Sequence, residues 1–462
     1  MKDDHKLAAP TRELARWIAS LRYEDLPQRT REVVRISLLD TLGAAIYGHS
    51  TPWAQMLLAW TRRGQGSEAR VWGESRATLR TSDAALVNAT AAHAFELDDY
   101  HNAKLHPGAA VIPAAMAVAE KNDARGSDLV VAIAAGYETM IRTSLALNPT
   151  AARLRGWHLT GVCGPFGAAA ASAVLLKLPP EQTAWALGLA GTQGAGLWAF
   201  NADGTMSKRL HAGKAAHSGV LAAELAQLGF TGPTQIYEVE DGGVLRAFSD
   251  ASDSTELTRG LGSVYHLEQT SLKPYSCCGS THSYIDAALA LRRTLGSPWD
   301  IARKVRVGTS KVVDVQCGFD YAPSSALNAQ MSLRYAVAAA LLDGQVLPAQ
   351  FTAAKMADPA LVGLARSIEL VPDPELDKLY PKDFAGWVSA EVAGSWQRVD
   401  IRNPTGSVHA PMDTRGVAEK FRRINPHLDT DAIAAMVHEI EKHSVRDLLD
   451  LFAKERAARS AA

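Results

Sequence analysis

The chain of 462 residues, of which 47% are hydrophobic, is too long for one hydrophobic core and predicts two domains. Its 48 lysines and arginines are balanced by 49 aspartates and glutamates, which excludes a broad basic surface for nucleic acid or anionic lipid. Residues 1–10 lack the apolar core of a signal peptide, and no stretch approaches the roughly 20 uncharged apolar residues of a membrane span. We therefore expect a cytoplasmic protein that binds neither nucleic acid nor a membrane.

The first 260 residues predict a helical domain, because their alanine-heavy composition favours helices and lets them approach closely. Hydrophobic residues recur at every third position from Val33 to Leu42, which predicts a helix that follows Pro27 and runs to about Tyr47. Further apolar runs, each bounded by glycine or proline, predict helices at 82–95, 108–120, 128–147, 167–176, 181–189 and 213–228.

The pattern changes from about residue 269, where strand-like alternation appears at 304–307, 367–370 and 387–392. Helical segments at 281–295 and 330–342 lie between these strands, which indicates an α+β domain over 269–403. The charged, helical residues 404–462 are expected to return to the first domain. The predicted fold is thus mainly α, with a large all-helical domain formed by residues 1–268 and the tail 404–462, and a smaller α+β lid domain inserted between them.

Four cysteines, at positions 163, 277, 278 and 317, include no pair at the two-residue spacing of a zinc knuckle or a redox dithiol. Cys277 and Cys278 are adjacent, which strains a mutual disulfide. We expect buried thiols without a disulfide framework.

The densest polar group occupies residues 96–108, between two apolar helical runs. A loop between buried helices normally needs only a cap and a glycine, whereas this one concentrates carboxylates, imidazoles, a phenol and an ammonium. Its spacing matches neither a helical zinc site nor a calcium loop, so we expect acid–base chemistry and no metal. Its candidate residues are Glu96, Asp98, Asp99, Tyr100, His101, Lys104 and His106.

A second group, residues 157–167, places His158 ahead of Gly161, Gly164 and Gly167. If the next helix begins at these glycines, its free amides would attract a carboxylate, and His158 could donate to the same anion or move a proton. Close helix packing would also require glycines. The glycine spacing does not match a dinucleotide loop, and we expect no cofactor.

Cations gather in a third group at 203–214, which contains Lys208, Arg209, His211 and Lys214. In a nearly neutral protein they supply the local positive field that a multiply charged acid needs. A fourth group, residues 273–282, adds Lys273 at the start of the second domain. No Gly-x-Ser-x-Gly elbow or Walker loop occurs, so proton transfer beside a carboxylate remains the chemistry these groups favour.

Together the four groups resemble the MmgE/PrpD family, which includes 2-methylcitrate dehydratase, cis-aconitate decarboxylase and iminodisuccinate epimerase. The stretches that carry the resemblance are 38–43, 96–108, 136–138, 158–167, 203–213, 273–282 and 332–344. The resemblance implies the same two-domain fold and a homodimer. It also implies pocket roles for Glu96, Tyr100, His106, His158, Lys208, Lys273 and Tyr321, with Asp98, Asp99 and Cys278 nearby.

Three positions depart from the decarboxylase branch, where we expect aspartate at Glu96, threonine at Tyr100 and histidine at Cys278. We therefore expect a lyase that dehydrates a 2-methylcitrate-like acid, with an iminodisuccinate-type epimerase, a cis-aconitate-type decarboxylase or a non-catalytic carboxylate-binding protein as alternatives. The substrate is a small di- or tricarboxylic acid in each case.

Removal of a proton next to a carboxylate needs a positioned base and a cationic environment for the developing negative charge. We assign the base to His106 or His158 and the electrostatic stabilisation to Lys208 and Lys273. Tyr100 or Tyr321 then protonates a leaving hydroxyl.

Overall fold

The structure is a computed structural model that describes residues 9–64, 66–74, 77–202, 204–296, 299, 303–380 and 382–460, with the backbone alone for 453–460. The chain divides into two units. Unit 1 comprises Met1–Ala94, Asp98–Thr270 and Asp413–Ala462, and unit 2 comprises Phe95–Leu97 and Ser271–Met412. Unit 2 thus starts two residues after the predicted boundary at 269, ends nine residues after 403 and includes a short segment from the first polar group.

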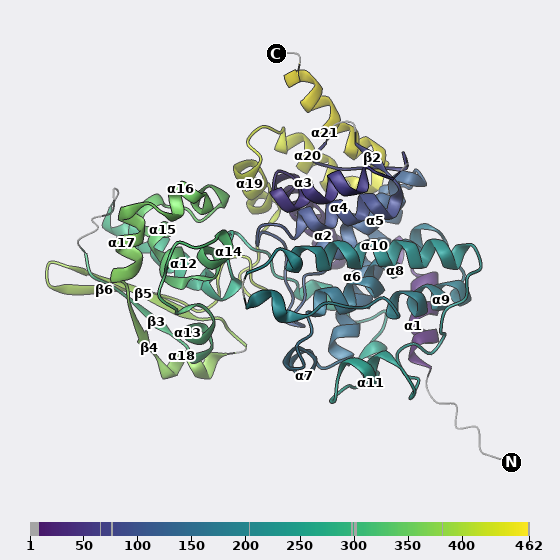
Figure 1. Cartoon of the computed structure of the whole chain (residues 1–462), viewed down its shortest axis with the longest axis horizontal. Coiled ribbons are helices and arrows are strands. Elements are labelled where there is room, and N and C mark those ends of the chain that lie inside the picture. The colour runs from purple at the N-terminus through teal and green to yellow at the C-terminus, as the bar shows by residue number, and fades with distance from the viewer. Residues whose placement is uncertain are drawn as a thin grey trace. The chain divides into compact units, whose positions relative to one another are not determined.

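Unit 1 is built from helices (Figure 1). The helices before unit 2 are α1 Pro10–Ser20, α2 Gln28–Gly48, α3 Pro52–Thr61, α4 Thr81–Ala92, α5 Pro107–Lys121, α6 Gly126–Ala146, α7 Pro149–Leu154, α8 Leu159–Leu175, α9 Pro180–Gly191, α10 Ser207–Gln227 and α11 Val244–Phe248. The tail adds α19 Thr414–Ile424, α20 Thr430–His438 and α21 Val445–Ser460. A two-stranded antiparallel pair, β1 Ala69–Arg70 and β2 Thr78–Leu79, completes these elements. Short 3₁₀ turns occur at η1 Tyr23–Asp25, η2 Trp198–Asn201, η3 Ser254–Leu257, η4 His266–Gln269 and η7 Ile440–Lys442.

Helices α5, α6 and α8 form the buried centre of unit 1, and α4 and α10 pack against them. Helix α6 is long and apolar enough to cross a membrane, but 94% of its apolar window is buried inside the protein, as in the core helix of a globular fold. The core is rich in alanine, and small side chains let these helices approach closely.

The tail packs on the N-terminal part of unit 1. Phe421 of α19 lies 3.1 Å from the position that a side-chain carbon on Gly43 of α2 would occupy. The Asn425 amide donates a hydrogen bond of 2.9 Å to the Gly43 carbonyl oxygen. Residues almost 400 positions apart therefore share one core.

Unit 2 contains a four-stranded sheet in the order β4-β3-β5-β6. Strand β3 pairs with β4 in parallel and with β5 antiparallel, and β5 pairs with β6 antiparallel. Helix α12 packs against β5 and β6. The strands and the larger helices are β3 Val305–Thr309, β4 Glu369–Pro372, β5 Gly386–Val392, β6 Ser395–Ile401, α12 His282–Leu295, α15 Leu333–Asp343 and α17 Pro359–Ser367. The shorter elements are η5 Gly279–Thr281, α13 Lys311–Cys317, α14 Ala326–Met331, η6 Pro348–Phe351, α16 Ala353–Met356 and α18 Pro374–Leu379.

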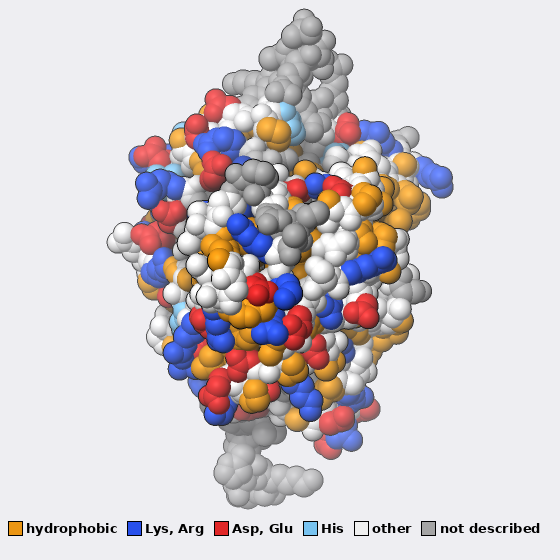
Figure 2. All heavy atoms as spheres, turned by 90° about the vertical axis from the view of Figure 1, so that its left-hand side faces the viewer, with side chains coloured by type: hydrophobic (Ala, Val, Ile, Leu, Met, Phe, Trp, Pro, Cys, Tyr) orange, Lys and Arg blue, Asp and Glu red, His pale blue; other side chains and the backbone are white. Residues whose placement is uncertain are grey.

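These observations confirm the predicted fold class, a mainly helical protein with an α+β part. Each predicted strand has a counterpart, and β6 is an addition. Acidic and basic side chains are interspersed over the described part of the face shown in Figure 2. This face therefore carries no broad field of one sign.

Candidate active site

Asp98 lies at the centre of a buried acid–base group in unit 1. His93, directly after α4, places its Nδ1 atom 2.6 Å from Asp98 Oδ2. His106, directly before α5, places its Nδ1 atom 3.3 Å from the same oxygen. The side chains of His93 and Asp98 are fully buried, and that of His106 is 17% exposed. One carboxylate therefore contacts two imidazoles that belong to different ends of the polar loop.

The Nδ1 atom of His106 also lies 2.7 Å from the carbonyl oxygen of Asp99. A carbonyl oxygen only accepts hydrogen bonds, so Nδ1 of His106 carries a proton and the neutral ring presents Nε2 as its basic nitrogen. The Thr160 hydroxyl accepts a hydrogen bond of 3.2 Å from the backbone amide of His106 and fixes this end of the loop.

Asp98 and its neighbour Asp99 have opposite electrostatic environments. Both side chains are buried, which favours the protonated form, but His93 and His106 hold the pKa of Asp98 well below its usual range. Burial raises the pKa of Asp99 to about 7, although it accepts hydrogen bonds from the Tyr137 hydroxyl (2.7 Å) and the Gly108 amide (2.9 Å). Asp98 therefore supplies the negative charge of this group, while Asp99 links the loop to α5 and α6.

His158 joins the group from the N-cap position directly before α8. Its ring centroid is 6.0 Å from that of His93, and its Nδ1 atom is 3.0 Å from Nδ1 of His211 in α10. Burial holds the pKa of His158 well below its usual range and lowers that of His93 to about 4. At neutral pH both rings are therefore uncharged.

The prediction that α8 begins at the glycines of the second group is wrong. The helix begins at Leu159. Gly164 and Gly167 lie beyond its first turn, and the Gly161 amide donates to the His158 carbonyl oxygen (2.9 Å), so these amides are not free to bind an anion. A side-chain carbon on Gly167 would lie 2.7 Å from the Gly136 carbonyl oxygen of α6, and one on Gly164 would lie 2.7 Å from the Ala215 methyl group of α10. Gly164 and Gly167 are therefore required by close helix packing.

Lys208 supplies the positive charge of the cluster. It lies in the first turn of α10, which begins at Ser207 and not near Gly213 as the sequence pattern suggests. Lys208 is 8% exposed, and its charge opposes protonation of both His93 and His158. Arg209 turns toward the end of α4, where it donates to the Ala94 carbonyl oxygen (3.4 Å) and lies over the Trp53 ring. Asp203, at the start of the third group, lies outside the described residues.

We call these residues the histidine cluster: His93, Asp98, His106, His158, Lys208 and His211. The sequence prediction omitted His93, because it ends an apolar helical run, where a histidine is usually a core residue. Its position three residues before the polar loop could have identified it as a candidate site residue. In the described part of the chain, Nε2 of His93 and Oδ1 of Asp98 are buried without a hydrogen-bond partner. Both atoms can therefore accept a hydrogen bond from a substrate or water.

Of the other predicted residues of the first loop, Asp99 is described above and Glu96 below, and the remaining three have different surroundings. His101 is buried, and its Nδ1 atom accepts a hydrogen bond from the Ala103 amide of its own turn (3.0 Å). Lys104 is exposed and Tyr100 is partly exposed.

Unit 2 holds the remaining candidates. Lys273 donates a hydrogen bond of 2.8 Å to Glu96, and both side chains are at most 5% exposed. Glu96 has a φ of 55°, a left-handed conformation that costs energy for a residue other than glycine and is often found at functional sites. Tyr321 donates to the Met356 carbonyl oxygen (3.1 Å), and Cys278 is partly exposed. Burial raises the pKa of Tyr321 to about 12.

His93, Asp98 and His106 are also close enough to be metal ligands, with one donor atom from each within 4.8 Å of the others. Both imidazoles, however, direct Nδ1 toward the same carboxylate oxygen, and this is a hydrogen-bonding arrangement. A metal ligand must lose that proton. The donor geometry therefore fits acid–base chemistry better than a metal centre, and the absence of a metal stays a prediction.

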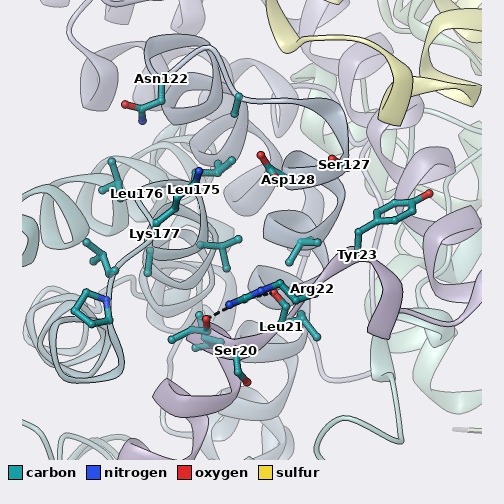
Figure 3. A pocket seen from close by; sticks show the side chains of 18 of the residues that line it. Ser20, Leu21, Arg22, Tyr23, Asn122, Ser127, Asp128, Leu175, Leu176 and Lys177 are labelled. Carbon is teal, nitrogen blue, oxygen red and sulfur yellow. Dashed lines mark hydrogen bonds between the residues drawn. The ribbon is translucent and has the colours of Figure 1, made fainter.

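A cavity of about 1080 Å³ opens elsewhere on unit 1 (Figure 3). It is lined by the end of α1, the turn between α5 and α6 and the segment between α8 and α9, with Arg22, Asp128 and Lys177 among its polar residues. No residue of the histidine cluster lines it. The size of this cavity therefore gives no information about the candidate site.

Comparisons with known proteins cover nearly the whole chain. The model of the MmgE/PrpD N-terminal domain matches residues 12–256, and that of the MmgE/PrpD C-terminal domain matches residues 275–443. A cis-aconitate decarboxylase of Aspergillus terreus is 31% identical over 91% of this chain and 90% of its own length. A cis-aconitate decarboxylase-like protein of Aspergillus oryzae is 32% identical over 80% of both chains. The human cis-aconitate decarboxylase is 28% identical over 96% of this chain and 93% of its own.

Proposed function

Because the chain belongs to the MmgE/PrpD family, we propose that it is a lyase that decarboxylates a small unsaturated tricarboxylic acid of the cis-aconitate type. The relatives reported above are named for cis-aconitate decarboxylation. Their names favour decarboxylation over the dehydration that the sequence motifs favoured. The observation that carries the proposal is the histidine cluster, which combines an ionised carboxylate, neutral imidazoles and a buried ammonium.

The chemistry of this substrate class defines what the protein must supply. The carboxylate that leaves is attached to a methylene carbon next to a carbon–carbon double bond. When CO₂ departs, the electron pair of the broken bond forms a new double bond, and the pair of the old double bond moves to the far carbon. That carbon then takes up one proton. The enzyme therefore needs a proton donor and a cation that stabilises the negative charge during the shift.

Lys208 fits the role of the cation, because it is buried beside uncharged rings and its charge is little screened by water. His106 fits the role of the proton donor. It is more exposed than His93 and His158, and the ionised Asp98 beside it can stabilise the charge of the ring while it holds a second proton. After transfer to carbon, the neutral ring regains a proton from solvent.

Dehydration of a 2-methylcitrate-type hydroxy acid is the second candidate. Glu96, Tyr100 and Cys278 differ from the residues that we expect in the decarboxylase branch, and Glu96 forms a buried ion pair with Lys273 within unit 2. In this reaction His106 would remove a carbon-bound proton through Nε2 before a hydroxyl leaves. The same ring can serve both reactions, because each requires one proton transfer at carbon.

A substrate panel tests both candidates. The purified protein is incubated with cis-aconitate, 2-methylcitrate and iminodisuccinate in deuterated water, and the products are followed by carbon-13 and proton NMR. We expect CO₂ and a methylene-bearing dicarboxylate with one deuterium from cis-aconitate. An unsaturated product from 2-methylcitrate alone would replace the first candidate by the second. Deuterium exchange with inversion of iminodisuccinate would identify an epimerase, and binding without any turnover would indicate a carboxylate-binding protein.

A pair of variants connects the reaction to the cluster. His106→Gln removes the ring that we assign to proton transfer, whereas His438→Gln alters an exposed histidine in α20. We expect turnover to fall by about 10² to 10⁴-fold in the first variant, the usual contribution of a general acid or base, and to be unchanged in the second. Equal turnover in both variants would remove His106 from the mechanism.

A further inference from the structure

His211 is the member of the histidine cluster that contacts His158. It lies in α10, three residues after Lys208, and its Nδ1 atom is 3.0 Å from Nδ1 of His158. The centroids of the two rings are 5.2 Å apart, and the ring planes are inclined by 45°. His211 is partly exposed, whereas His158 is 2% exposed. The buried ring therefore forms a hydrogen bond with a ring that solvent can reach.

The backbone near Gly196 holds both members of this pair. The Gly196 carbonyl oxygen accepts a hydrogen bond of 2.9 Å from the backbone amide of His158. A side-chain carbon on Gly196 would lie 3.2 Å from Nδ1 of His211, and one on Gly161 would lie 3.2 Å from Cβ of His211. Larger residues at these two positions would press on His211. The two glycines therefore leave room for its side chain beside His158.

Aromatic rings enclose His158 on its other sides. Trp198 and Phe200 approach it edge to face, with ring centroids at 5.6 and 5.2 Å, and His93 stacks on it at 6.0 Å. Phe200 also contacts the His211 ring, at 5.9 Å. These contacts fix the orientation of the His158 ring with Nδ1 toward His211. The hydrogen bond uses Nδ1 of His158 and leaves Nε2 for other partners.

The two rings share one proton between their Nδ1 atoms. Burial holds the pKa of His158 well below its usual range and lowers that of His211, and the charges of Lys208, His93 and His106 further oppose protonation of His158. Both rings are therefore uncharged at neutral pH. A neutral imidazole has one N–H and one acceptor nitrogen, so one Nδ1 donates and the other accepts. The proton state of Nδ1 in His158 then determines whether its Nε2 is a donor or an acceptor.

We propose that His211 is a positioning residue, which holds the His158 ring in one orientation and one neutral tautomer. Without this bond the ring could exchange between its two tautomers, and Nε2 would be a donor in some molecules and an acceptor in others. With the bond, Nε2 of His158 meets a bound acid in a single protonation state. The consequence for turnover rests on the proposed function, whereas the fixed tautomer does not.

Nitrogen-15 NMR of the full-length protein without substrate tests the tautomer. The histidine rings are labelled, and correlations between ring protons and nitrogens at pH 7 distinguish a protonated nitrogen from an unprotonated one. The signals of His158 are assigned by their loss in His158→Gln. We expect one nitrogen of each kind in the wild type and, in His211→Phe, the intermediate shifts of exchanging tautomers.

Intermediate shifts for His158 in the wild type, or the same His158 shifts in the wild type and in His211→Phe, would overturn the proposal. The wild-type spectrum needs no change at His211, so it decides the question even where His211→Phe does not fold.

A double-mutant cycle tests whether His211 acts through His158. We expect His211→Phe to lower kcat by about tenfold in the wild-type background, the effect of one hydrogen bond, and by less than about twofold in a His158→Gln background. His211→Gln should restore most of the turnover, because its amide offers both a donor and an acceptor. An equal loss in the two backgrounds would show a structural role alone and would overturn the positioning role.

His217→Phe is the matched control for His211→Phe. His217 lies in the same helix, outside the histidine cluster, and its Nε2 atom is 3.8 Å from Asp83. Its kcat should stay within about twofold of the wild type, since an exposed pair of this kind contributes little. A wild type that turns over no acid would refute the proposed lyase, and the NMR spectra would still decide whether His211 fixes His158.

Discussion

His93 is the residue of the cluster that touches Asp98 most closely, and together with His106 it keeps this buried carboxylate ionised. In His93→Phe a ring of similar size remains but the donor is lost, so the pKa of Asp98 should rise. We expect the acid side of the pH–rate profile to move to higher pH and the free energy of unfolding to fall by about 1 to 3 kcal/mol. Steady-state kinetics over a range of pH and denaturant titrations measure these effects.

His93→Asn is the matched control, because the amide of asparagine can replace the N–H donor. It should keep the position of the acid limb and most of the turnover. If the two variants had the same profile, shape and not hydrogen bonding would explain the requirement for His93.

His101 gives a prediction for stability against pH. Its pKa is lowered to about 4 in the folded protein, chiefly by burial, whereas an unfolded histidine titrates near about 6.5. Between these values the unfolded chain binds the proton and the folded chain does not, so the contribution of His101 to stability is present above pH 6.5 and is lost as pH falls toward 4. At pH 5 the loss amounts to about 2 kcal/mol relative to pH 7.

The comparison with His101→Asn isolates this contribution. Asparagine keeps an acceptor for the Ala103 amide but does not titrate. Urea denaturation at pH 7 and pH 5 should show that the wild type loses about 2 kcal/mol more than the variant over this interval. Equal losses of the free energy of unfolding in the two proteins would mean that His101 is accessible to protons in the folded state.

At the scale of elements, α10 presents two lysines with different surroundings. Lys208 is buried within the histidine cluster, whereas Lys214, six residues later, is exposed and donates to Ser218. If Lys208 stabilises the charge of the transition state, Lys208→Met should lower kcat by about 10²-fold or more. Lys214→Met should leave kcat within about threefold, because exposed charges are screened by water. Undiminished turnover in Lys208→Met would exclude this lysine from the mechanism.

Helices α6 and α8 approach closely at Gly167. Gly167→Ala would place a methyl group 2.7 Å from the Gly136 carbonyl oxygen and 2.8 Å from the Met140 side chain. We expect a loss of about 1 to 3 kcal/mol in the free energy of unfolding, even though alanine favours helices over glycine by about 1 kcal/mol.

Gly363 in α17 of unit 2 is the control, because a side-chain carbon there meets no atom within 4 Å. Gly363→Ala should be neutral or stabilising by up to about 1 kcal/mol. Denaturant titrations of both variants against the wild type measure these effects. Stabilisation by Gly167→Ala would show that α6 and α8 can separate without cost.

The same helices explain which parts of the fold the sequence could predict. The spacing of apolar residues predicted both ends of α2 to within one residue, because the buried side of this helix is continuous. It placed the start of α8 eight residues too late and that of α10 six residues too late. Glycines and polar residues interrupt the apolar pattern at the start of both helices. Close helix packing and the position of the charged groups require these residues there. The sequence did not predict strand β6, because its side chains are mostly exposed and buried and exposed positions alternate little along it.

At the scale of the molecule, the two-part organisation was predictable because the change from helical to alternating patterns coincides with the start of unit 2 near residue 271. The assignment of Phe95–Leu97 to unit 2 could not be predicted from the sequence, because it depends on long-range contacts. The Gln330 amide donates to the Phe95 carbonyl oxygen, and Lys273 binds Glu96. No local pattern shows that the polar loop divides, with Glu96 in one unit and Asp98 in the other.

The return of the tail to unit 1 can be tested at the contact between α19 and α2. Lys420 of α19 forms a buried ion pair of 2.6 Å with Asp40 of α2, and both side chains are at most 4% exposed. Lys420→Met would leave the Asp40 carboxylate buried without this partner, and removing one member of a buried pair costs about 3 to 5 kcal/mol. In the double variant Asp40→Leu and Lys420→Met no unpaired charge is buried, so most of the stability should return. Urea denaturation at pH 7 measures all three proteins. A single variant as stable as the wild type, or a double variant less stable than the single, would mean that the pair does not hold the tail on unit 1.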